Sequence, residues 1–366
     1  MTTDTYERVW PDIAIPPGEL LGEELEVRGM SQQELARRMG RPAQMVNELI
    51  HGKKALTPET ALGLEKVLGI PASFWTNSES SYHLIKSRLA ERERLEEEAS
   101  SWLPEFPVTD LIRRQVLPVG ARAKPWEKAH ALLQFLGFSS FEQWEAQTAT
   151  AAGLRVTDAK RASRGALAVW LREGELDGHE QEAAPYNQNE FHKALRALRS
   201  LTTSHPRVFA TQMQERCAAA GVVVSFVKEY PKANATGAAR WLQPDKGQIQ
   251  LSLRHKTADM LWFSFYHEAE HLLGKRFKGT RIDGLQGIEQ NAEEEEACDA
   301  FARDTLIPEG DWSGFVYKEC FTEGEVQAFA ADVGVHPGIV VGQLQHEHLI
   351  RFNHLNHLKM RLEWED

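Results

Sequence analysis

Two histidines and a glutamate in the second half of the chain have the types and spacing of a metal site. The run LWFSFYHEAEHLL, residues 261–273, contains His267-Glu268-x-x-His271. Helical positions four apart lie about 40° apart around the axis, so both imidazoles would point the same way, with Glu268 leaning toward a metal-held water. The apolar neighbours predict a buried helix, and buried histidines need partners. The pattern indicates a zinc site, with a chance match as the alternative.

A catalytic zinc site also needs a third protein ligand and one position left open for water. Four consecutive glutamates, residues 293–296, open the next predicted helix. Such a run is ordinarily a solvated first turn that the helix dipole favours. Glu295 and Asp299, however, are four apart and share the apolar face of this helix. Glu295 can therefore be the third ligand, while Asp299 accepts the free ring N–H of a ligating histidine.

These residue types permit metal-assisted amide hydrolysis. A bound zinc ion would lower the pKa of water toward about 7 and polarise the carbonyl, while Glu268 takes a proton and returns it to the leaving amine. A donor to the developing oxyanion is also expected. The candidates are His336, Tyr266 and Arg240. Tyr266 is the weakest, because it points about 100° away from its neighbour His267 on the helix.

A second group of polar residues, near the amino terminus, has the spacing of a DNA reader. Residues 31–33 (Ser-Gln-Gln) open one predicted helix, Gly40 supplies a tight turn, and the next helix carries Gln44 and Asn47. Residues three apart share a helix face, so both amides could pair with base edges. Residues 37–54 carry a local net charge of +4, although the chain as a whole is acidic. The basic residues are Arg37, Arg38, Arg41, Lys53 and Lys54.

Residues 16–75, with the SQQELA entry and the GKK-x-LTPETA run, resemble the Cro/repressor-like DNA-binding domain of HigA-type antitoxins, the xenobiotic-response-element (XRE) family. The resemblance implies that Gln32 contacts phosphate and that the next helix enters the major groove. It assigns the groove to Gln44, Met45 and Asn47, and the DNA backbone to Lys53 and Lys54. Arg41 completes the expected DNA-binding set. The alternative is a four-helix module whose polar third helix is merely solvated. Helix-turn-helix proteins read paired half-sites on DNA, so we expect a homodimer.

Residues 235–308, with TGAARWL, HEAEH and EEACDAFARDTLIP, resemble the ImmA/IrrE family of zinc metallopeptidases. In this family the HExxH run is followed by the pattern E-x-x-x-[ND]-x-F-A. Aligning its F-A with Phe301-Ala302 places the pattern's glutamate at Glu295. The resemblance therefore implies His267, His271 and Glu295 as Zn²⁺ ligands, Glu268 as the catalytic base and Asp299 at the Asn/Asp position. Thr305 and Glu270 depart from the family's usual residues.

The elements that must position these residues are mostly helices. Periodicity predicts helices at residues 18–28, 31–39, 43–51, 58–68, 82–100, 129–144, 160–172, 190–201, 257–273 and 290–306, and from 337 onward. Two or three strands are expected between residues 222 and 253. The tail histidines at 346, 348, 354 and 357 would lie in one helix or a helix pair and be solvated or interfacial.

The predicted fold class is mainly α with a small β-sheet (α+β). The predicted division is a DNA-binding domain at residues 1–77, a helical scaffold at 78–205, a zincin-like domain at 206–310 and a helical tail at 311–366.

Composition limits the alternatives. The chain has 366 residues, a net charge of −11 and three cysteines without a CxxC pair, which disfavours disulfides and thiolate zinc sites. It shows no apolar run of membrane-span length, no signal peptide and no nucleotide-binding or serine-hydrolase motif. We therefore expect a cytoplasmic protein without a membrane partner.

Three functions remain open. The first is a DNA-binding regulator whose zinc endopeptidase domain hydrolyses a protein substrate, a partner repressor or itself, to change transcription. The second is a HigA-like antitoxin and autorepressor whose zincin domain senses a signal or binds a cognate toxin without hydrolysis. The third is a metal-stabilised structural protein, which Glu268 disfavours because a structural site has no need of a base.

Overall fold

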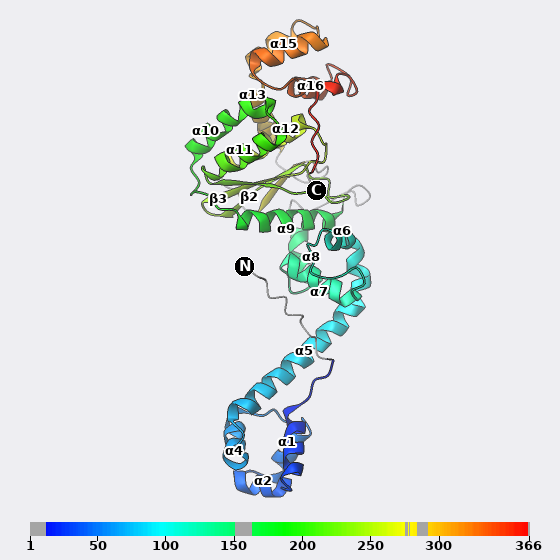
Figure 1. The fold of residues 1–366 in the computed structure, drawn as a ribbon, viewed down its shortest axis with the longest axis vertical. Coiled ribbons are helices and arrows are strands. Elements are labelled where there is room, and N and C mark those ends of the chain that lie inside the picture. The colour runs from blue at the N-terminus through cyan, green and yellow to red at the C-terminus, as the bar shows by residue number, and fades with distance from the viewer. Residues whose placement is uncertain (1–11, 151–162, 275–276, 278, 284–291, 365–366) are drawn as a thin grey trace. The chain divides into compact units, whose positions relative to one another are not determined.

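The computed structural model describes residues 12–150, 163–274, 277, 279–283 and 292–364. The chain forms two compact units, Met1–Ser100 and Ser101–Asp366, and each is described by itself (Figure 1). Within the described residues both units are mainly helical and the second contains one small sheet, so the predicted α+β class is confirmed. In that part of the chain, no helix is long and apolar enough to span a bilayer.

The amino-terminal unit begins with four short helices, as predicted. They are α1 (Pro17–Val27), α2 (Gln32–Met39), α3 (Ala43–Ile50) and α4 (Pro58–Leu68). The Ser31 hydroxyl accepts from the Glu34 amide at 3.1 Å and caps α2, because the first-turn amides of a helix have no internal partner. Gly40 ends α2 with φ of 62°, a left-handed conformation that glycine adopts without steric cost.

Helix α5 (Ala72–Trp102) begins earlier than the predicted helix at 82–100. The reason is Trp75, which is only 1% exposed and packs into the amino-terminal core with Leu21, Leu35 and Leu64. The first turn of α5 is therefore part of this core, although the charged sequence that follows is typical of a solvated helix.

The second unit opens with α6 (Val108–Arg113), α7 (Pro125–Leu136) and α8 (Phe141–Thr150). The single helix predicted at 129–144 is wrong, because Gly137 ends α7 with φ of 77°. The helix predicted at 160–172 is α9 (Arg164–Glu180), and residues 160–162 lie outside the described residues. Helix α9 continues through two glycines that would ordinarily weaken a helix.

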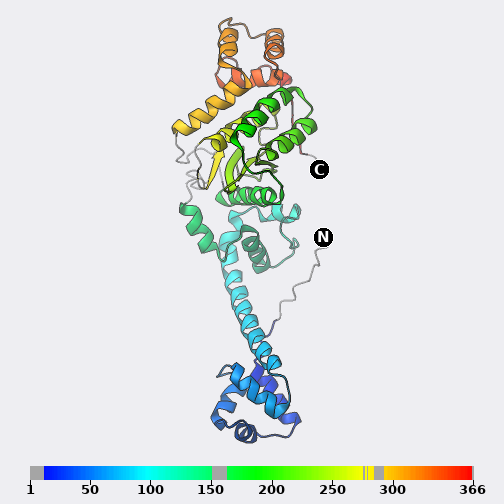
Figure 2. The ribbon, with the colours of Figure 1, turned by 90° about the vertical axis from the view of Figure 1, so that its left-hand side faces the viewer.

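Among the described residues, four strands form one mixed sheet. They are β1 (Val222–Phe226), β2 (Gly237–Gln243), β3 (Lys246–Leu251) and β4 (Thr280–Asp283), in the order β1-β3-β2-β4. Strand β1 runs parallel to β3, and β2 runs antiparallel to both β3 and β4. Strand β4, the yellow arrow at one edge of the sheet in Figure 2, was not predicted.

The two faces of the sheet differ in chemistry. Ile249 and Leu251 of β3 face the apolar core beneath α11 (Pro206–Ala218) and α12 (Ala258–Leu273). Their neighbours Gln248 and Gln250 face α9, which covers the opposite face in Figure 1.

Gly174 and Gly178 of α9 make room for these glutamine side chains. A Cβ atom at Gly174 would lie 2.0 Å from Gln250 Oε1, and one at Gly178 would lie 2.3 Å from Gln248 Nε2. Gln250 donates to the Trp170 carbonyl at 2.6 Å, and Gln248 donates to the Gly174 carbonyl at 2.5 Å. The polar positions of β3 are therefore buried and hydrogen-bonded rather than exposed.

The remaining helices complete the second unit. They are α10 (Gln188–Arg199), α13 (Ala292–Leu306), α14 (Glu309–Val316), α15 (Glu323–Val333) and α16 (Pro337–His346). Helix α16 ends at His346, and His348 and Leu355 both have φ of 58°. The tail histidines after His346 therefore lie in turns and a short 3₁₀ segment at 356–358, and the predicted helical tail is wrong for this segment.

Candidate functional site

Helix α12 places the two histidines of the HExxH run on one buried face. The helix packs against both the sheet and α13, and its own Trp262 and Phe265 are fully buried. The side chains of His267 and His271 are 3% and 1% exposed, and their ring centroids are 5.1 Å apart. Two imidazoles thus face the same space from successive turns, as their spacing predicts.

Glu295 of α13 reaches both histidines through its two carboxylate oxygens. Its Oε2 lies 3.2 Å from His267 Nε2, and its Oε1 lies 3.5 Å from His271 Nε2. Two ligand atoms each about 2.0–2.1 Å from a tetrahedral zinc ion are about 3.4 Å apart. The three side chains therefore have the donor types and spacing of a zinc-ligand set, and Glu295 retains 23% exposure, which leaves a route for an ion.

The outer nitrogen of each histidine meets a second carboxylate. His267 Nδ1 lies 2.9 Å from Asp299 Oδ1, in the position expected from the sequence. His271 Nδ1 lies 3.3 Å from Glu294 Oε1. Such contacts place the proton on Nδ1 and leave Nε2 free to bind a metal.

Sequence reasoning gave no separate role to Glu294, one of the four consecutive glutamates at 293–296. Arg281 of β4 holds this carboxylate with two hydrogen bonds of 3.0 and 3.2 Å. Four consecutive glutamates do not show which one contacts the metal-binding nitrogens and which one contacts Arg281, because that depends on the position of β4.

Cys298 lies on the outer side of the same histidine. Its Sγ is 3.5 Å from His271 Nδ1, the nitrogen that Glu294 also approaches. His267, His271 and Cys298 form a second possible ligand cluster, but Glu295 alone bridges the two Nε2 atoms among these neighbours. Burial raises the pKa of the Cys298 thiol, which keeps it protonated and makes it the poorer ligand.

Burial also acts on His271, whose pKa it lowers, with further lowering by the neighbouring His267. A lowered pKa favours the neutral imidazole, the form that binds a metal.

Glu268 is fully buried and lies against β2. A Cβ atom at Gly237 would fall 2.6 Å from Glu268 Oε1, so the carboxylate occupies space that only a glycine leaves open. Gly237 is therefore a positioning residue for Glu268. The TGAARWL run contains this glycine, but nothing in the run indicates that Glu268 packs against it.

The three oxyanion-donor candidates are engaged elsewhere in the fold. Tyr266 donates to the Leu195 carbonyl of α10 at 3.0 Å. Arg240 donates to the Leu171 carbonyl at 2.9 Å, on the α9 face of the sheet. His336 accepts from the Gly338 amide at 3.1 Å and caps α16, so none of the three expectations is supported by its contacts.

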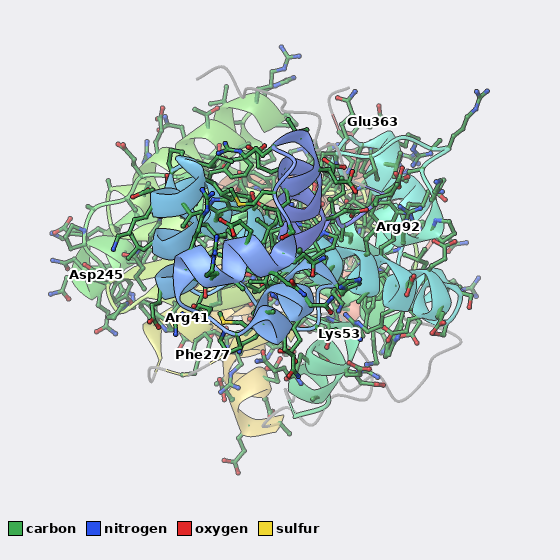
Figure 3. The ribbon with its side chains drawn as sticks, turned by 90° about the horizontal axis from the view of Figure 1, so that it is seen from below. Arg41, Lys53, Arg92, Asp245, Phe277 and Glu363 are labelled. Carbon is green, nitrogen blue, oxygen red and sulfur yellow. The ribbon has the colours of Figure 1, made fainter. Side chains whose placement is uncertain are left out.

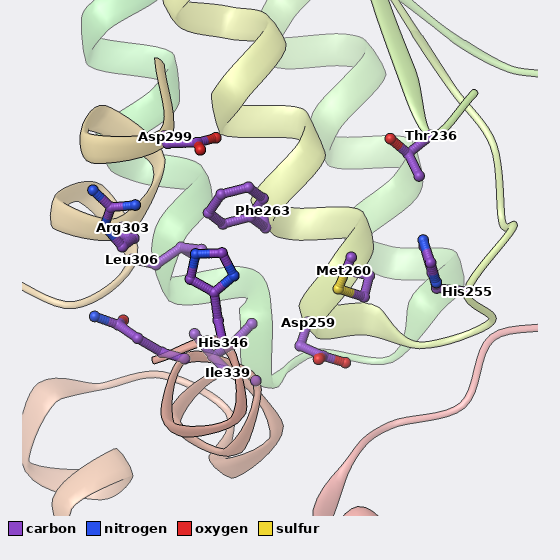
Figure 4. A pocket seen from close by; sticks show the side chains of 12 residues that line it. Thr236, His255, Asp259, Met260, Phe263, Asp299, Arg303, Leu306, Ile339 and His346 are labelled. Carbon is purple, nitrogen blue, oxygen red and sulfur yellow. The ribbon is translucent and has the colours of Figure 1, made fainter. Parts of the chain in front are cut away.

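A pocket of about 290 Å³ adjoins the candidate metal site (Figure 4). Asp299 belongs to both the site and the pocket. The ring of Phe263 of α12, which lines the pocket, has its centroid 6.3 Å from that of His267 and 6.2 Å from that of His346. The lining residues are Thr236, His255, Asp259, Met260, Phe263, Asp299, Arg303, Leu306, Ile339, Gly342, Gln343 and His346. His346 thus lines a pocket beside the site, a position that sequence spacing could not show.

In the amino-terminal unit, α2, the Gly40 turn and α3 form the expected helix-turn-helix. Gln44 and Asn47 are exposed on α3, and Asn47 Nδ2 donates to Gln32 Oε1 of α2 at 3.3 Å. Lys53 and Lys54 are exposed in the loop after α3, and Figure 3 labels Lys53 together with Arg41. These polar side chains are available to a partner.

Further members of the predicted DNA-binding set have contacts within this unit, including Gln44, whose Nε2 donates to Glu48 Oε1 at 2.9 Å. Met45 is half-buried against the amino-terminal core rather than fully presented on the surface. Arg41 forms an ion pair with Glu59, and Arg38 pairs with Glu34 at 2.7 Å. These acids reduce the local positive charge that residues 37–54 alone indicated.

A family model described as helix-turn-helix matches residues 22–75, which include α2, the Gly40 turn and α3. Virulence-associated protein I of Dichelobacter nodosus is 34% identical over 82 residues, 22% of this chain and 73% of that protein. The uncharacterized helix-turn-helix-type transcriptional regulator YddM of Escherichia coli is 34% identical over 71 residues, 19% of this chain and 76% of that protein. A solved structure of Pseudomonas aeruginosa antitoxin HigA with the higBA promoter is 30% identical and covers 24% of this chain and 95% of that chain, with a TM-score of 0.22. Through its amino-terminal domain, this chain belongs to the helix-turn-helix family of DNA-binding regulators.

Proposed function

We propose that this chain is a transcriptional regulator that binds operator DNA and carries a zinc-dependent endopeptidase of the ImmA/IrrE type in its second unit. The endopeptidase would hydrolyse a protein substrate, either a partner repressor or the chain itself, and so change transcription. The observation that carries the enzymatic part is the contact of one carboxylate, Glu295, with the Nε2 atoms of both His267 and His271.

The surrounding residues support a catalytic rather than a structural metal site. Only three protein ligands are proposed, which leaves a fourth position for water, and Glu268 supplies a base that a structural site would not need. Asp299 and Glu294 orient the two imidazoles from outside.

In the proposed reaction, a bound zinc ion supplies the Lewis acidity that activates water and polarises the scissile carbonyl. Glu268 accepts the proton of the attacking water and donates it to the leaving amine, so the carboxylate ends the cycle as it began. Gly237 allows Glu268 to lie close to the sheet. The adjoining pocket at Phe263 and His346 would hold a substrate side chain next to the reacting amide.

For the DNA-binding part, we propose that α3 enters the major groove with Gln44 and Asn47 against base edges. Gln32 would reach a phosphate, and Lys53 and Lys54 would contact the DNA backbone after α3. Because Glu34 and Glu59 offset part of the basic charge, affinity should be modest for one copy, and a homodimer on paired half-sites would raise it.

The test is elemental analysis of the full chain purified near neutral pH without chelator, combined with two variants. Wild type and Glu268→Gln should each hold about one zinc per chain, whereas Glu295→Ala should retain less. Hydrolysis of the chain itself or of a quenched fluorescent peptide library should be present in wild type and absent in Glu268→Gln. Equal zinc content and equal hydrolysis in all three proteins would contradict the assignment.

A zinc-loaded wild type that binds DNA but cleaves no peptide or protein would point instead to a HigA-like antitoxin and autorepressor. In that case the second unit would sense a signal or hold a cognate toxin. Co-purification of a toxin encoded beside the gene, with unchanged mass of both proteins, would distinguish this function from proteolysis.

A further inference from the structure

A second cavity lies on the opposite side of the sheet from the candidate metal site. It has a volume of about 390 Å³ and is bounded by α7, α8, α9 and the paired strands β2 and β4. Leu136, Phe138, Leu171 and Leu242 supply apolar wall. The volume lies in the range of small-molecule sites, and the lining combines this apolar wall with polar and charged side chains.

One cation lining this cavity is buried, and none of the described carboxylates forms an ion pair with it. Arg240 is 7% exposed and donates to the Leu171 carbonyl at 2.9 Å and to Gln250 Oε1, which are both neutral acceptors. Its Nε has no hydrogen-bond partner among the residues that the structure describes. Burial lowers the pKa of Arg240 to about 10, so the guanidinium still carries its charge at neutral pH. A buried charge without a direct ionic partner is costly to maintain.

Two carboxylates, Glu175 of the wall and Glu268, stabilise the charge of Arg240 and oppose the effect of burial on its pKa, and neither forms an ion pair with it among the described residues. Glu175 is itself paired with Arg172 at 2.8 Å, so its carboxylate is shared between two cations. With both arginines and the single carboxylate counted, the described lining has a net charge of +1. Within the described lining, an anionic ligand would supply the direct ionic contact that Arg240 does not make.

We propose that this cavity binds a small carboxylic acid with an apolar body, the carboxylate pairing with Arg240 and the body lying against Leu136, Phe138 and Leu242. Arginine binds carboxylates through charge-assisted, often paired, hydrogen bonds. The neutral contacts to Leu171 and Gln250 hold the guanidinium in position before the ligand arrives.

The cavity is also linked to the candidate metal site through β2. Arg240 pairs across the sheet with Thr280 of β4, which lines the cavity, and Gly237 three residues earlier lies against Glu268. An occupant that shifts β2 would therefore move Glu268. This second step rests on the proposed peptidase function, whereas binding itself does not.

The test is calorimetric titration of the full chain with benzoate, indole-3-acetate and octanoate, together with the neutral indole-3-acetamide. At least one carboxylate should bind wild type, and Arg240→Gln should weaken that binding at least tenfold. The acetamide should bind at least tenfold more weakly than indole-3-acetate. Arg114→Gln is the matched control, since Arg114 likewise donates to backbone carbonyls, those of Lys228 and Glu229, but does not line the cavity.

If Arg240→Gln fails to fold, Ala168→Leu replaces it, because Ala168 of α9 lines the cavity and is not one of the acceptors to which Arg240 donates. This variant should exclude indole-3-acetate while keeping the Tm of wild type. No binding by any of the three carboxylates at millimolar concentration, or equal affinity for the acid and the amide, would overturn the site. Binding without any change in peptide hydrolysis would overturn the link to Glu268 and leave the site itself supported.

Discussion

Replacing Gly237 by alanine tests whether the contact between β2 and Glu268 sets catalytic geometry. The new Cβ would lie 2.6 Å from Glu268 Oε1 and 2.8 Å from its Cγ, whereas ordinary contact begins at 3.4 Å. Relief of the overlap requires the carboxylate or the strand to move by about 0.8 Å. A displacement of about 1 Å at a reacting group reduces the rate on the order of 100-fold. The carboxylate does not ligate the proposed metal, so zinc content should stay at the wild-type value.

The assay is the initial rate of hydrolysis of a quenched fluorescent peptide library by the zinc-loaded full chain, with elemental analysis on the same samples. Overpacking costs about 1–3 kcal/mol, so Gly237→Ala should remain folded at 25 °C, and its Tm verifies this. Gly247→Ala is the control within the sheet, because its Cβ meets only flexible side-chain methyls, the nearest, of Leu272, at 3.2 Å. If Gly237→Ala hydrolyses peptides within twofold of wild type, Glu268 either is not the base or does not depend on this contact.

Three further predictions follow from other contacts. Gln44→Ala combined with Asn47→Ala should abolish the preference for operator over random duplex while leaving salt-sensitive binding, and unchanged discrimination in a gel-shift titration would show that α3 is not the reading helix. Glu294→Ala should weaken zinc retention about 10- to 100-fold in a chelator competition, because it removes the carboxylate on His271 Nδ1; wild-type retention would rule out that role. Glu173→Gln keeps an acceptor for the Tyr230 hydroxyl, now 2.8 Å away, and removes a carboxyl whose pKa burial raises above 4.5. As pH rises, Glu173 ionises in the unfolded chain before it does in the folded chain, so its contribution to wild-type stability falls above about pH 4.5. The variant should therefore have the higher Tm at pH 7 but not at pH 4. A Tm difference that is independent of pH would contradict this account.

Local signals predicted the parts of the fold that depend on neighbours in sequence. The helices of the amino-terminal unit follow from caps and glycines such as Ser31 and Gly40, whose effects act within one turn. The HExxH spacing likewise predicted that His267 and His271 share a face, since helical geometry alone determines it. The approach of Asp299 to His267 also agrees with its expected place.

The features that sequence reasoning missed depend on distant segments. Strand β4 is four residues long and has no apolar alternation, and it forms because β2 offers an edge to pair with. The role of Glu294 depends on Arg281 of that strand. Helix α9 extends through Gly174 because Gln250 needs the space, and a glycine within a sequence gives no indication of what packs against it.

The burial of the polar sheet face beneath α9 determines how the chain can be cut. A fragment beginning at residue 206 would keep the four strands and the proposed metal ligands but would lose α9. Gln248 and Gln250 would then lose their hydrogen bonds to the carbonyls of Gly174 and Trp170. The sheet face that α9 covers would be exposed to water or would contact another copy of the fragment. The smallest piece expected to remain monodisperse therefore begins upstream of Ser163, whose hydroxyl caps α9. Proteases added to the native chain should yield a stable core that retains this helix.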